Sequence, residues 1–229
     1  VLDGAKAFAL PTKMGQNLNI EEGNNKEIIW KSYDADGSIW FEDTILFSDI
    51  SKGVNPENES VKTTLTTILH EAFKLNPDFI LNSNGYRITT ELGFPKSWGL
   101  GTSSTLINNI AQWLNIDAFI LLKNSFGGSG YDIACAQNKT PILYHLEQGN
   151  PIVEKVTFNP EFTQHLYFVY LNKKQSSKTA IAAYNINKKN NLAKTIALND
   201  SITSEVLNAT TIQSFATAIQ KHEVQMSII

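Results

Sequence analysis

A short loop rich in glycine and hydroxyl residues, from residue 95 to residue 104, is the part of this sequence best suited to chemistry. It reads Pro-Lys-Ser-Trp-Gly-Leu-Gly-Thr-Ser-Ser and runs into apolar residues spaced as on one face of a helix, at positions 106, 107, 110, 111 and 114. The start of a helix presents backbone N–H groups without internal partners, together with the positive end of the helix dipole. The loop therefore predicts an anion site, and phosphate is the anion that suits it best.

A plain capped helix is the alternative interpretation of the same loop. Residues 102–104 are all good N-cap types, and glycines before a helix are common without a ligand. Two details favour the phosphate site. Gly99 and Gly101 leave bare backbone on both sides of Leu100, and three hydroxyls exceed what a cap needs, so a spare one could bind Mg²⁺ or a phosphate oxygen. The loop is neither a Walker A loop nor the dinucleotide-binding fingerprint.

A second glycine-rich segment, Phe126-Gly-Gly-Ser-Gly-Tyr-Asp132, places an aspartate before a short apolar stretch. An aspartate at such a position is often an N-cap and nothing more. Phosphoryl transfer, however, needs a phosphate nest, a cation and a carboxylate near the acceptor hydroxyl. The loop at 95–104 and Asp132 together supply the protein's share of these. None of the four histidines pairs with another at metal-ligand spacing, and no Gly-x-Ser-x-Gly nucleophile elbow is present.

The elements expected to position these residues mix helices and strands. Residues 27–33 and 38–47 predict a β-hairpin around the turn Asp34–Gly37, and residues 61–75 predict a helix that Asn76-Pro77 ends. We also expect a loop at 55–60, strands at 79–81, 86–92, 141–146 and 166–171, a short apolar element at 118–122, a strand or turn at 176–184, and a largely helical stretch at 201–222.

The amino-acid composition limits the classes of protein to which this chain can belong. The 229 residues are 42% hydrophobic and 18% charged, which is ordinary for a soluble globular protein, and a net charge of −3 gives no attraction to nucleic acid or anionic membranes. Cys135 is the single cysteine, which excludes a disulfide within the chain and a cysteine zinc site. Without a long apolar run or a signal peptide, we expect a cytoplasmic protein. The abrupt ends at Val1 and Ile229 suggest part of a longer polypeptide, with a domain junction near Asn159-Pro160.

The two glycine segments resemble those of the GHMP kinases, the superfamily of galactokinase, homoserine kinase, mevalonate kinase and phosphomevalonate kinase. The second motif of that superfamily, Pro-x-x-x-Gly-Leu-Gly-Ser-Ser-Ala, is matched from Pro95 to Ser104, with Thr102 for the first Ser and Ser104 for the Ala. Residues 128–132 are similar to the Gly-Ser-Gly-Phe-Asp of phosphomevalonate kinases, and residues 130–134 to a bacterial subgroup named after Gly-Tyr-Asp-Ile-Ala. Residues 1–4 with 7–9 resemble the end of the first motif.

The resemblance implies an α+β fold, with an N-terminal domain like ribosomal protein S5 domain 2 (residues 1–160) and a ferredoxin-like C-terminal domain (161–229), incomplete at both ends. It implies ATP and Mg²⁺ as cofactors and Asp132 as the catalytic residue that orients or deprotonates an acceptor hydroxyl. Ser103 falls where mevalonate kinases supply a Mg²⁺-binding hydroxyl. The implied ATP-binding residues are Pro95, Gly99, Leu100, Gly101, Thr102, Ser103, Ser104, Ser129 and Gly130.

The sequence also departs from the family pattern. The lysine that mevalonate kinases place near their aspartate lies upstream of this chain, and Lys6 matches a different position. No glutamate precedes Gly127 where those enzymes hold Mg²⁺, and the third, C-terminal glycine motif is absent. We expect a kinase of a small metabolite, with mevalonate or phosphomevalonate as first choices. A sugar or homoserine kinase and a non-catalytic nucleotide or metabolite sensor remain alternatives, and the sequence does not predict the oligomeric state.

Overall fold

The computed structural model describes residues 1–54, 60–171, 177–188 and 192–227, and the chain divides into two compact units. One unit is Thr12–Ala136, and the other combines Val1–Pro11 with Gln137–Ile229. The units therefore divide the chain elsewhere than at residue 160, because 137–160 group with the first eleven residues. The assignment of an ATP-binding domain to 1–160 concerns function and stays a prediction. The loop predicted at 55–60 lies outside the described residues apart from Ser60.

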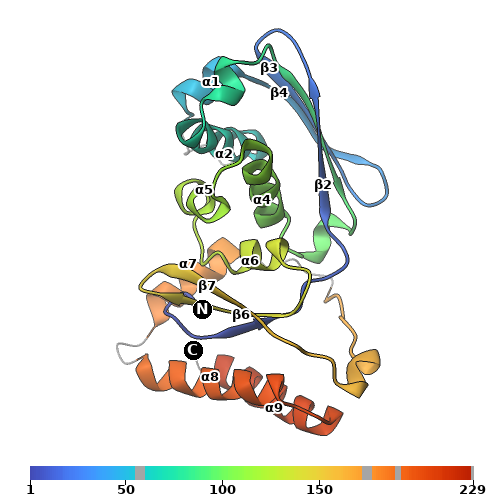
Figure 1. Ribbon diagram of the computed structural model, residues 1–229, viewed down its shortest axis with the longest axis vertical. Helices are drawn as coiled ribbons and strands as arrows, with labels where there is room; N and C mark the ends of the chain where they lie inside the picture. Colours follow the sequence, from blue (N-terminus) through green and yellow to red (C-terminus); the bar gives the residue numbers. More distant parts are fainter. Residues whose placement is uncertain (55–59, 172–176, 189–191, 228–229) are drawn as a thin grey trace. The chain divides into compact units, whose positions relative to one another are not determined.

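The unit Thr12–Ala136 is built on a four-stranded sheet of order β2-β5-β3-β4 (Figure 1). The predicted hairpin is confirmed, and its turn places Gly37 at φ 80°, a left-handed conformation that favours glycine. Strands β3 and β5 are parallel, so a crossover must join them, and the described residues between β4 and β5 form three helices. These elements are β2 (Gln16–Glu22), β3 (Glu27–Tyr33), β4 (Ile39–Leu46), α1 (Phe47–Lys52), α2 (Val61–Leu75), α3 (Asp78–Leu81) and β5 (Tyr86–Leu92).

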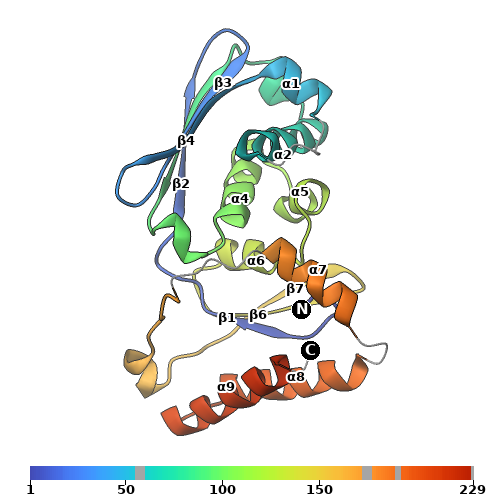
Figure 2. The same ribbon diagram turned by 180° about the vertical axis from the view of Figure 1, so that it is seen from behind.

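Helices cover one face of this sheet, as Figures 1 and 2 show for α1, α2 and α4 (Thr102–Leu114). The core lies between the two layers and also takes in α5 (Ala118–Ser125). Its fully buried members include Trp30 and Ile88 from the sheet and Leu69, Ile107 and Leu121 from the helices. Burial of these side chains is the main contribution to the stability of the unit.

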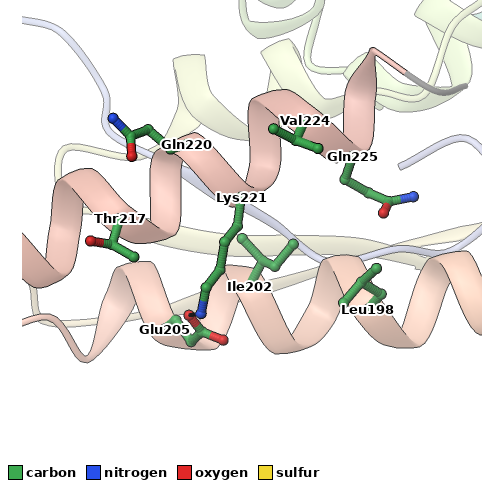
Figure 3. Close-up of a pocket in the computed structure, with 8 residues that line it drawn as sticks. All are labelled: Leu198, Ile202, Glu205, Thr217, Gln220, Lys221, Val224 and Gln225. Carbon is green, nitrogen blue, oxygen red and sulfur yellow. Dashed lines mark hydrogen bonds and ion pairs between the residues drawn. The ribbon is translucent and has the colours of Figure 1, made fainter.

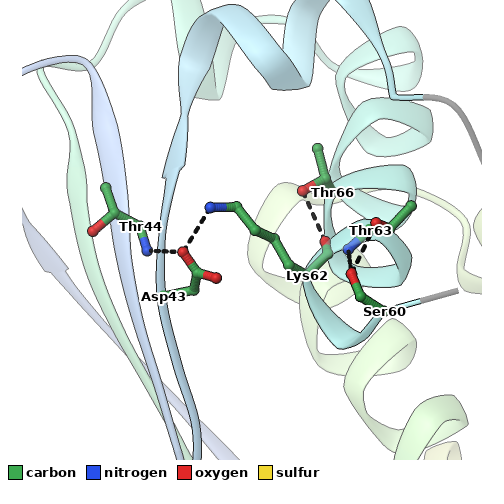
Figure 4. Close-up of polar contacts among 6 residues, drawn as sticks. All are labelled: Asp43, Thr44, Ser60, Lys62, Thr63 and Thr66. Atoms are coloured by element: carbon green, nitrogen blue, oxygen red, sulfur yellow. Dashed lines mark hydrogen bonds and ion pairs between the residues drawn. The ribbon is translucent and has the colours of Figure 1, made fainter. Parts of the chain in front are cut away.

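Local signals set both ends of α2, the helix whose predicted bounds are confirmed. The Ser60 hydroxyl accepts the Thr63 N–H at 3.0 Å, which caps the helix start, and Asn76 with Pro77 follows its last residue. Lys62 then ties the helix to the sheet, with its Nζ 2.6 Å from Oδ1 of Asp43 on β4 (Figure 4). The side chains of Lys62 and Asp43 are 44% and 34% exposed, so the ion pair contributes about 1 kcal/mol or less to the free energy of unfolding.

The second unit contains a three-stranded antiparallel sheet of order β1-β6-β7, and α8 contacts β1. The unit also contains an aromatic cluster, with the Phe8 ring 5.0 Å from that of Phe158 and the Phe162 ring 5.3 Å from that of Phe215. The elements are β1 (Ala7–Ala9), β6 (Ile142–Glu147), β7 (Asn150–Lys155), the 3₁₀ helix η2 (Glu161–His165), α7 (Ser177–Asn187), α8 (Ala193–Leu207) and α9 (Ile212–Met226).

Helices α8 and α9 of this unit pack side by side and leave a groove of about 510 Å³ between them (Figure 3). Lys221 of α9 reaches Glu205 of α8, with 2.6 Å between Nζ and Oε2. The groove contains none of the residues predicted to do chemistry. No helix among the described residues is long and apolar enough to cross a membrane.

Several predicted elements are wrong. Residues 79–81 belong to the short helix α3 instead of a strand, because a three-residue apolar run fits either element and tertiary packing decided. Residues 177–184 of the predicted strand or turn lie in α7, and 166–171 pair with no strand among the described residues. The helical stretch 201–222 is confirmed as parts of α8 and α9, with a break at Asn208–Thr211.

Candidate active site

The glycine loop brings its backbone to the start of α4 in the conformation that an anion site requires. Gly99 (φ 73°, ψ 27°) and Gly101 (φ 76°, ψ 34°) are both left-handed, and Gly101 is the N-cap of the helix. The Thr105 N–H makes the first helical bond, to the Gly101 carbonyl at 3.0 Å. The N–H groups of residues 102–104 precede that bond and are directed out of the helix start. Alternating left-handed residues followed by free N–H groups form an anion-binding nest.

The hydroxyl residues of the loop do not cap α4. The helix begins at Thr102, so Thr102, Ser103 and Ser104 occupy its first turn, and no side chain makes a capping hydrogen bond. A cap would require one of these hydroxyls at the position that Gly101 fills. The plain-cap alternative therefore does not describe this helix.

Hydrogen bonds to β2 hold the start of α4 in place. The Thr105 hydroxyl donates to Oε1 of Gln16 at 2.7 Å, and the Asn109 amide donates to the Gln16 carbonyl at 2.8 Å. Ser104 and Asn108 on the same helix are buried. The loop is thus attached to a packed helix, which limits its movement when a ligand binds.

Asp132 lies in the first turn of α6 (Tyr131–Gln137), directly after the second glycine segment. Gly127, Gly128 and Gly130 have φ values of 77°, 106° and 80°, which only glycine adopts at low cost. The chain returns by these turns to the first loop. A Cβ placed on Gly101 would lie 3.7 Å from Cγ of Asp132, in ordinary van der Waals contact. The two predicted segments therefore meet, with the carboxyl group of Asp132 beside the N-cap of α4.

The surroundings of Asp132 disfavour its charge. Its side chain remains accessible to solvent, yet loss of hydration to the protein atoms around it raises the pKa of Asp132 above the usual carboxyl value. Burial also raises the pKa of Tyr131 to about 12, and burial together with the Asp132 charge raises the pKa of Cys135. A carboxylate with a raised pKa is a better proton acceptor than an ordinary one.

The other predicted residues belong to the same two segments. Ser129 and Gly130 lie three and two residues before Asp132, and the Ser129 hydroxyl accepts the Tyr131 N–H at 3.4 Å. Pro95 begins the first loop at its far end, before the 3₁₀ helix η1 (Lys96–Trp98). Among the described residues, no group of three or more His, Cys, Asp or Glu side chains could hold a metal ion. The metal role of Ser103 stays a prediction.

Sequence reasoning missed Trp40 and Lys96, which lie together at the start of the first loop. Lys96 Nζ is 4.2 Å from the centroid of the Trp40 ring, and the Lys96 N–H donates to Oδ1 of Asp34 at 2.8 Å. Trp40 is the extra residue of a β-bulge, since Ser32 pairs with Phe41 and the next pair is Tyr33 with Ile39. Its Nε1 is buried without a hydrogen-bond partner among the described residues. No local signal in the sequence joins these two residues.

No family model and no curated protein matches this sequence. Solved structures do match. Mevalonate kinase from Methanococcus jannaschii superposes with a TM-score of 0.62 at 18% identity, over 98% of this chain and 73% of the other. A D-glycero-D-manno-heptose 1-phosphate kinase from Bacteroides thetaiotaomicron gives 0.62 at 16% identity, over 99% and 72%. The L. major mevalonate kinase, solved with R-mevalonate, gives 0.61 at 15% identity, over 99% and 70%.

These neighbours are mevalonate and heptose 1-phosphate kinases, and the α+β fold implied by the resemblance of the two glycine segments is confirmed. At sequence identities of 15 to 18%, these matches show a shared fold only. The activity of this chain has to be argued from the residues of its own site.

Proposed function

We propose that this protein is an ATP- and Mg²⁺-dependent phosphotransferase that phosphorylates a small metabolite. One observation carries the proposal: the loop that starts α4 and the carboxyl group of Asp132 meet at Gly101, where a Cβ would lie 3.7 Å from Cγ of Asp132. An anion cradle next to a carboxylate is unfavourable for simple anion storage, because the two negative charges repel. It is the arrangement that phosphoryl transfer to a hydroxyl needs.

In this mechanism the N–H groups of residues 102–104 and the dipole of α4 bind the β- and γ-phosphates of ATP. Asp132 accepts the hydrogen bond of the acceptor hydroxyl and orients its oxygen toward the γ-phosphorus. A bond forms between that oxygen and the γ-phosphorus while the bond from the γ-phosphorus to the bridging oxygen breaks. The hydroxyl proton passes to the carboxylate of Asp132, and ADP leaves. The raised pKa of Asp132 supports its role as the proton acceptor.

The residues present fit Mg²⁺ carried by the nucleotide. Ser103 and Asp132 offer hard oxygen donors, and Mg²⁺ in nucleotide sites takes one or two protein ligands, water and phosphate oxygens. A bound Mg²⁺ would neutralise charge on the phosphates. The hydroxyl of Ser103 in the first turn of α4 would hold it.

The pair Trp40 and Lys96 supports a nucleotide over inorganic phosphate as the ligand. An aromatic ring and a cation lie at the beginning of the loop, within the same compact unit. Stacking on an aromatic ring is one means by which proteins bind nucleobases. We assign the base of ATP to this end of the loop.

The residues of the site identify the nucleotide more directly than they identify the acceptor substrate. The segment around Asp132 is most similar to phosphomevalonate kinases, and two of the three neighbours described above are mevalonate kinases, so mevalonate and phosphomevalonate are the first candidates. The heptose phosphate kinase among the neighbours keeps a sugar acceptor as the second candidate. A non-catalytic nucleotide sensor is the alternative outside the enzymes, and the absent glutamate before Gly127 favours it.

Replacement of Asp132 by Asn separates these functions. ADP release is measured with ATP, Mg²⁺ and each of mevalonate, phosphomevalonate, homoserine and simple sugars, and ATP binding is followed by the rise in melting temperature. A kinase loses turnover in Asp132→Asn and keeps its ATP-induced rise. Asp117→Asn is the matched control, because Asp117 also lies at a helix start in the same unit, where it caps α5 and Asn can replace it. Turnover that survives in Asp132→Asn removes Asp132 from the mechanism, and ATP binding without turnover on any acceptor favours the sensor.

A further inference from the structure

The turn of the β3–β4 hairpin lies at the same edge of the sheet as the beginning of the glycine loop. Strands β3 and β5 are parallel neighbours, and the last pair between them joins Tyr33 to Glu91. Asp34 follows β3 directly, and Lys96 comes four residues after the end of β5. Because paired parallel strands end at a common edge, the topology brings these two residues together although they are 62 positions apart in the chain.

The carboxyl group of Asp34 is hydrogen-bonded to the backbone of the loop. Its Oδ1 accepts the Lys96 N–H at 2.8 Å and the Ala35 N–H at 2.8 Å. Lys96 is the first residue of η1, and the N-cap of η1 is Pro95, whose ring carries no polar atom. The first N–H groups of a helical turn have no partner within that turn. Asp34 therefore supplies, from another part of the chain, the cap that the loop itself lacks.

The hairpin turn holds Asp34 in place. The Asp34 N–H donates to the Ser38 carbonyl at 2.8 Å, and the Asp34 carbonyl accepts the Gly37 N–H at 2.9 Å. The residue is half-buried, so water competes less for its carboxylate than at a fully exposed turn. The carboxylate that reaches the loop is therefore anchored by its own backbone before any ligand binds.

The same hairpin also contacts the side chain of Lys96. Trp40, the extra residue of the β-bulge in β4, has its ring centroid 4.2 Å from the Lys96 Nζ. Asp34 thus binds the backbone of Lys96 and Trp40 its side chain. The other end of the loop is held separately, because Gln16 on β2 binds two side chains of α4. The loop is therefore fixed at its entry by the hairpin and at its exit by β2.

We propose that Asp34 is a positioning residue that fixes the entry of the glycine loop for binding the base of the nucleotide. This role rests on the proposed function, which assigns the base to Trp40 and Lys96. A loop that is already in its binding conformation loses less entropy when the ligand binds. Without the Asp34 acceptor, only a fraction of the molecules holds the entry in that conformation, and the apparent affinity falls by this fraction. The phosphates bind at residues 102–104, whose position depends on Gln16 instead.

Two aspartates of the same turn permit a matched test. Asp36 Oδ1 accepts the N–H and the hydroxyl of Ser38 at 2.9 and 2.6 Å, so Asp34→Ala and Asp36→Ala each remove a carboxylate that accepts two hydrogen bonds. Only Asp34→Ala removes a bond to the loop. It should weaken Mg-ATP binding about 2- to 12-fold, the worth of one ordinary hydrogen bond, and leave binding of inorganic triphosphate unchanged. Asp36→Ala should bind both ligands like the parent chain. Asp34→Asn keeps the acceptor oxygen and should restore ATP binding.

Isothermal titration calorimetry measures both affinities, and amide hydrogen exchange at Lys96 in the free protein should become faster in Asp34→Ala alone. Melting curves report whether each variant is folded. Asp34→Ser keeps a hydroxyl for the local turn and is too short to reach Lys96, so it gives the same test if Asp34→Ala is unfolded.

The outcomes separate this role from the proposed function. A parent chain that does not bind Mg-ATP contradicts the proposed function and the role of Asp34 with it. If the parent chain binds Mg-ATP and Asp34→Ala binds it equally well, the role of Asp34 alone is overturned. The same holds if Asp36→Ala loses as much affinity as Asp34→Ala, if Asp34→Asn does not restore binding, or if triphosphate binding falls together with ATP binding.

Discussion

Replacement of Gly101 by alanine, compared with the same change at Gly37, tests the phosphate nest. The two glycines have nearly equal φ values, 76° and 80°, in the left-handed region, where another residue costs on the order of 1–2 kcal/mol. A Cβ on Gly37 would meet nothing within 4 Å, and one on Gly101 would touch Asp132 without a clash. Both variants should therefore lose similar stability, a fall in melting temperature of about 2–8 °C for a chain of this size.

Their effects on nucleotide binding should differ. The left-handed Gly101 aims the N–H groups at the start of α4, and the added methyl occupies the space next to the Asp132 carboxyl group. Loss of one hydrogen bond to a charged phosphate costs about 1.5–3 kcal/mol, which weakens ATP binding about 10- to 150-fold. Isothermal titration calorimetry with Mg-ATP measures this directly.

The comparison between the two variants decides the outcome. Gly37→Ala in the β3–β4 turn should bind ATP like the parent chain. If Gly101→Ala binds ATP with unchanged affinity, the loop is not the phosphate site. If both variants lose affinity equally, the loss comes from general destabilisation and the assignment of the nest has no support.

Three further predictions concern charged side chains. Asp132→Asn should raise the melting temperature at neutral pH, because the raised pKa means that the ionised carboxyl group destabilises the folded state. The gain should vanish below the ordinary carboxyl pKa of 3.8, where the carboxyl group is protonated in both states. Melting curves from pH 3 to pH 8 check this, and a variant less stable than the parent chain at pH 7 contradicts it. Lys96 positions the Trp40 ring that we assign to the base, so Lys96→Met should weaken ATP binding by at most about 2- to 5-fold, the full worth of a partly exposed cation–π contact, and leave inorganic triphosphate binding unchanged. An equal loss for both ligands in a competition assay would place Lys96 at the phosphates. Lys62→Met should lower the free energy of unfolding, measured with urea, by about 1 kcal/mol or less and leave ATP binding unchanged, since its partner Asp43 is accessible to water. A decrease above about 2 kcal/mol would mean that the ion pair between α2 and β4 is stronger than its exposure indicates.

Local sequence signals predicted the elements whose ends are marked by capping, turn or proline residues. Ser60 before α2 and Asn76-Pro77 after it are sufficient to bound that helix, and the Asp34–Gly37 turn defines the hairpin. Elements without such signals were missed. Strand β2 was not predicted, because its sequence Gln-Asn-Leu-Asn-Ile-Glu-Glu is mostly polar and becomes a strand by pairing with β5.

Residues 166–171 show the opposite case. Their types favour a strand, yet a strand requires pairing, and the structure assigns no strand to these residues. Propensity specifies what a segment can do, and pairing depends on the rest of the fold.

By itself, the sequence determined the two glycine segments and the helix that follows the first of them, because glycine, hydroxyl and apolar spacing act over a few residues. The α+β class came from the resemblance of these segments to the GHMP kinases. Only the tertiary structure decided that Gly101 and not a hydroxyl caps α4, that Asp132 lies against that glycine, and that Lys96 lies over the ring of Trp40. The contacts of Asp132 with Gly101 and of Lys96 with Trp40 join residues far apart in the chain, and their geometry follows from how the helices pack on the sheet. The two segments of the site proposed for phosphoryl transfer can therefore be found in the sequence, whereas their contact with each other depends on the tertiary structure.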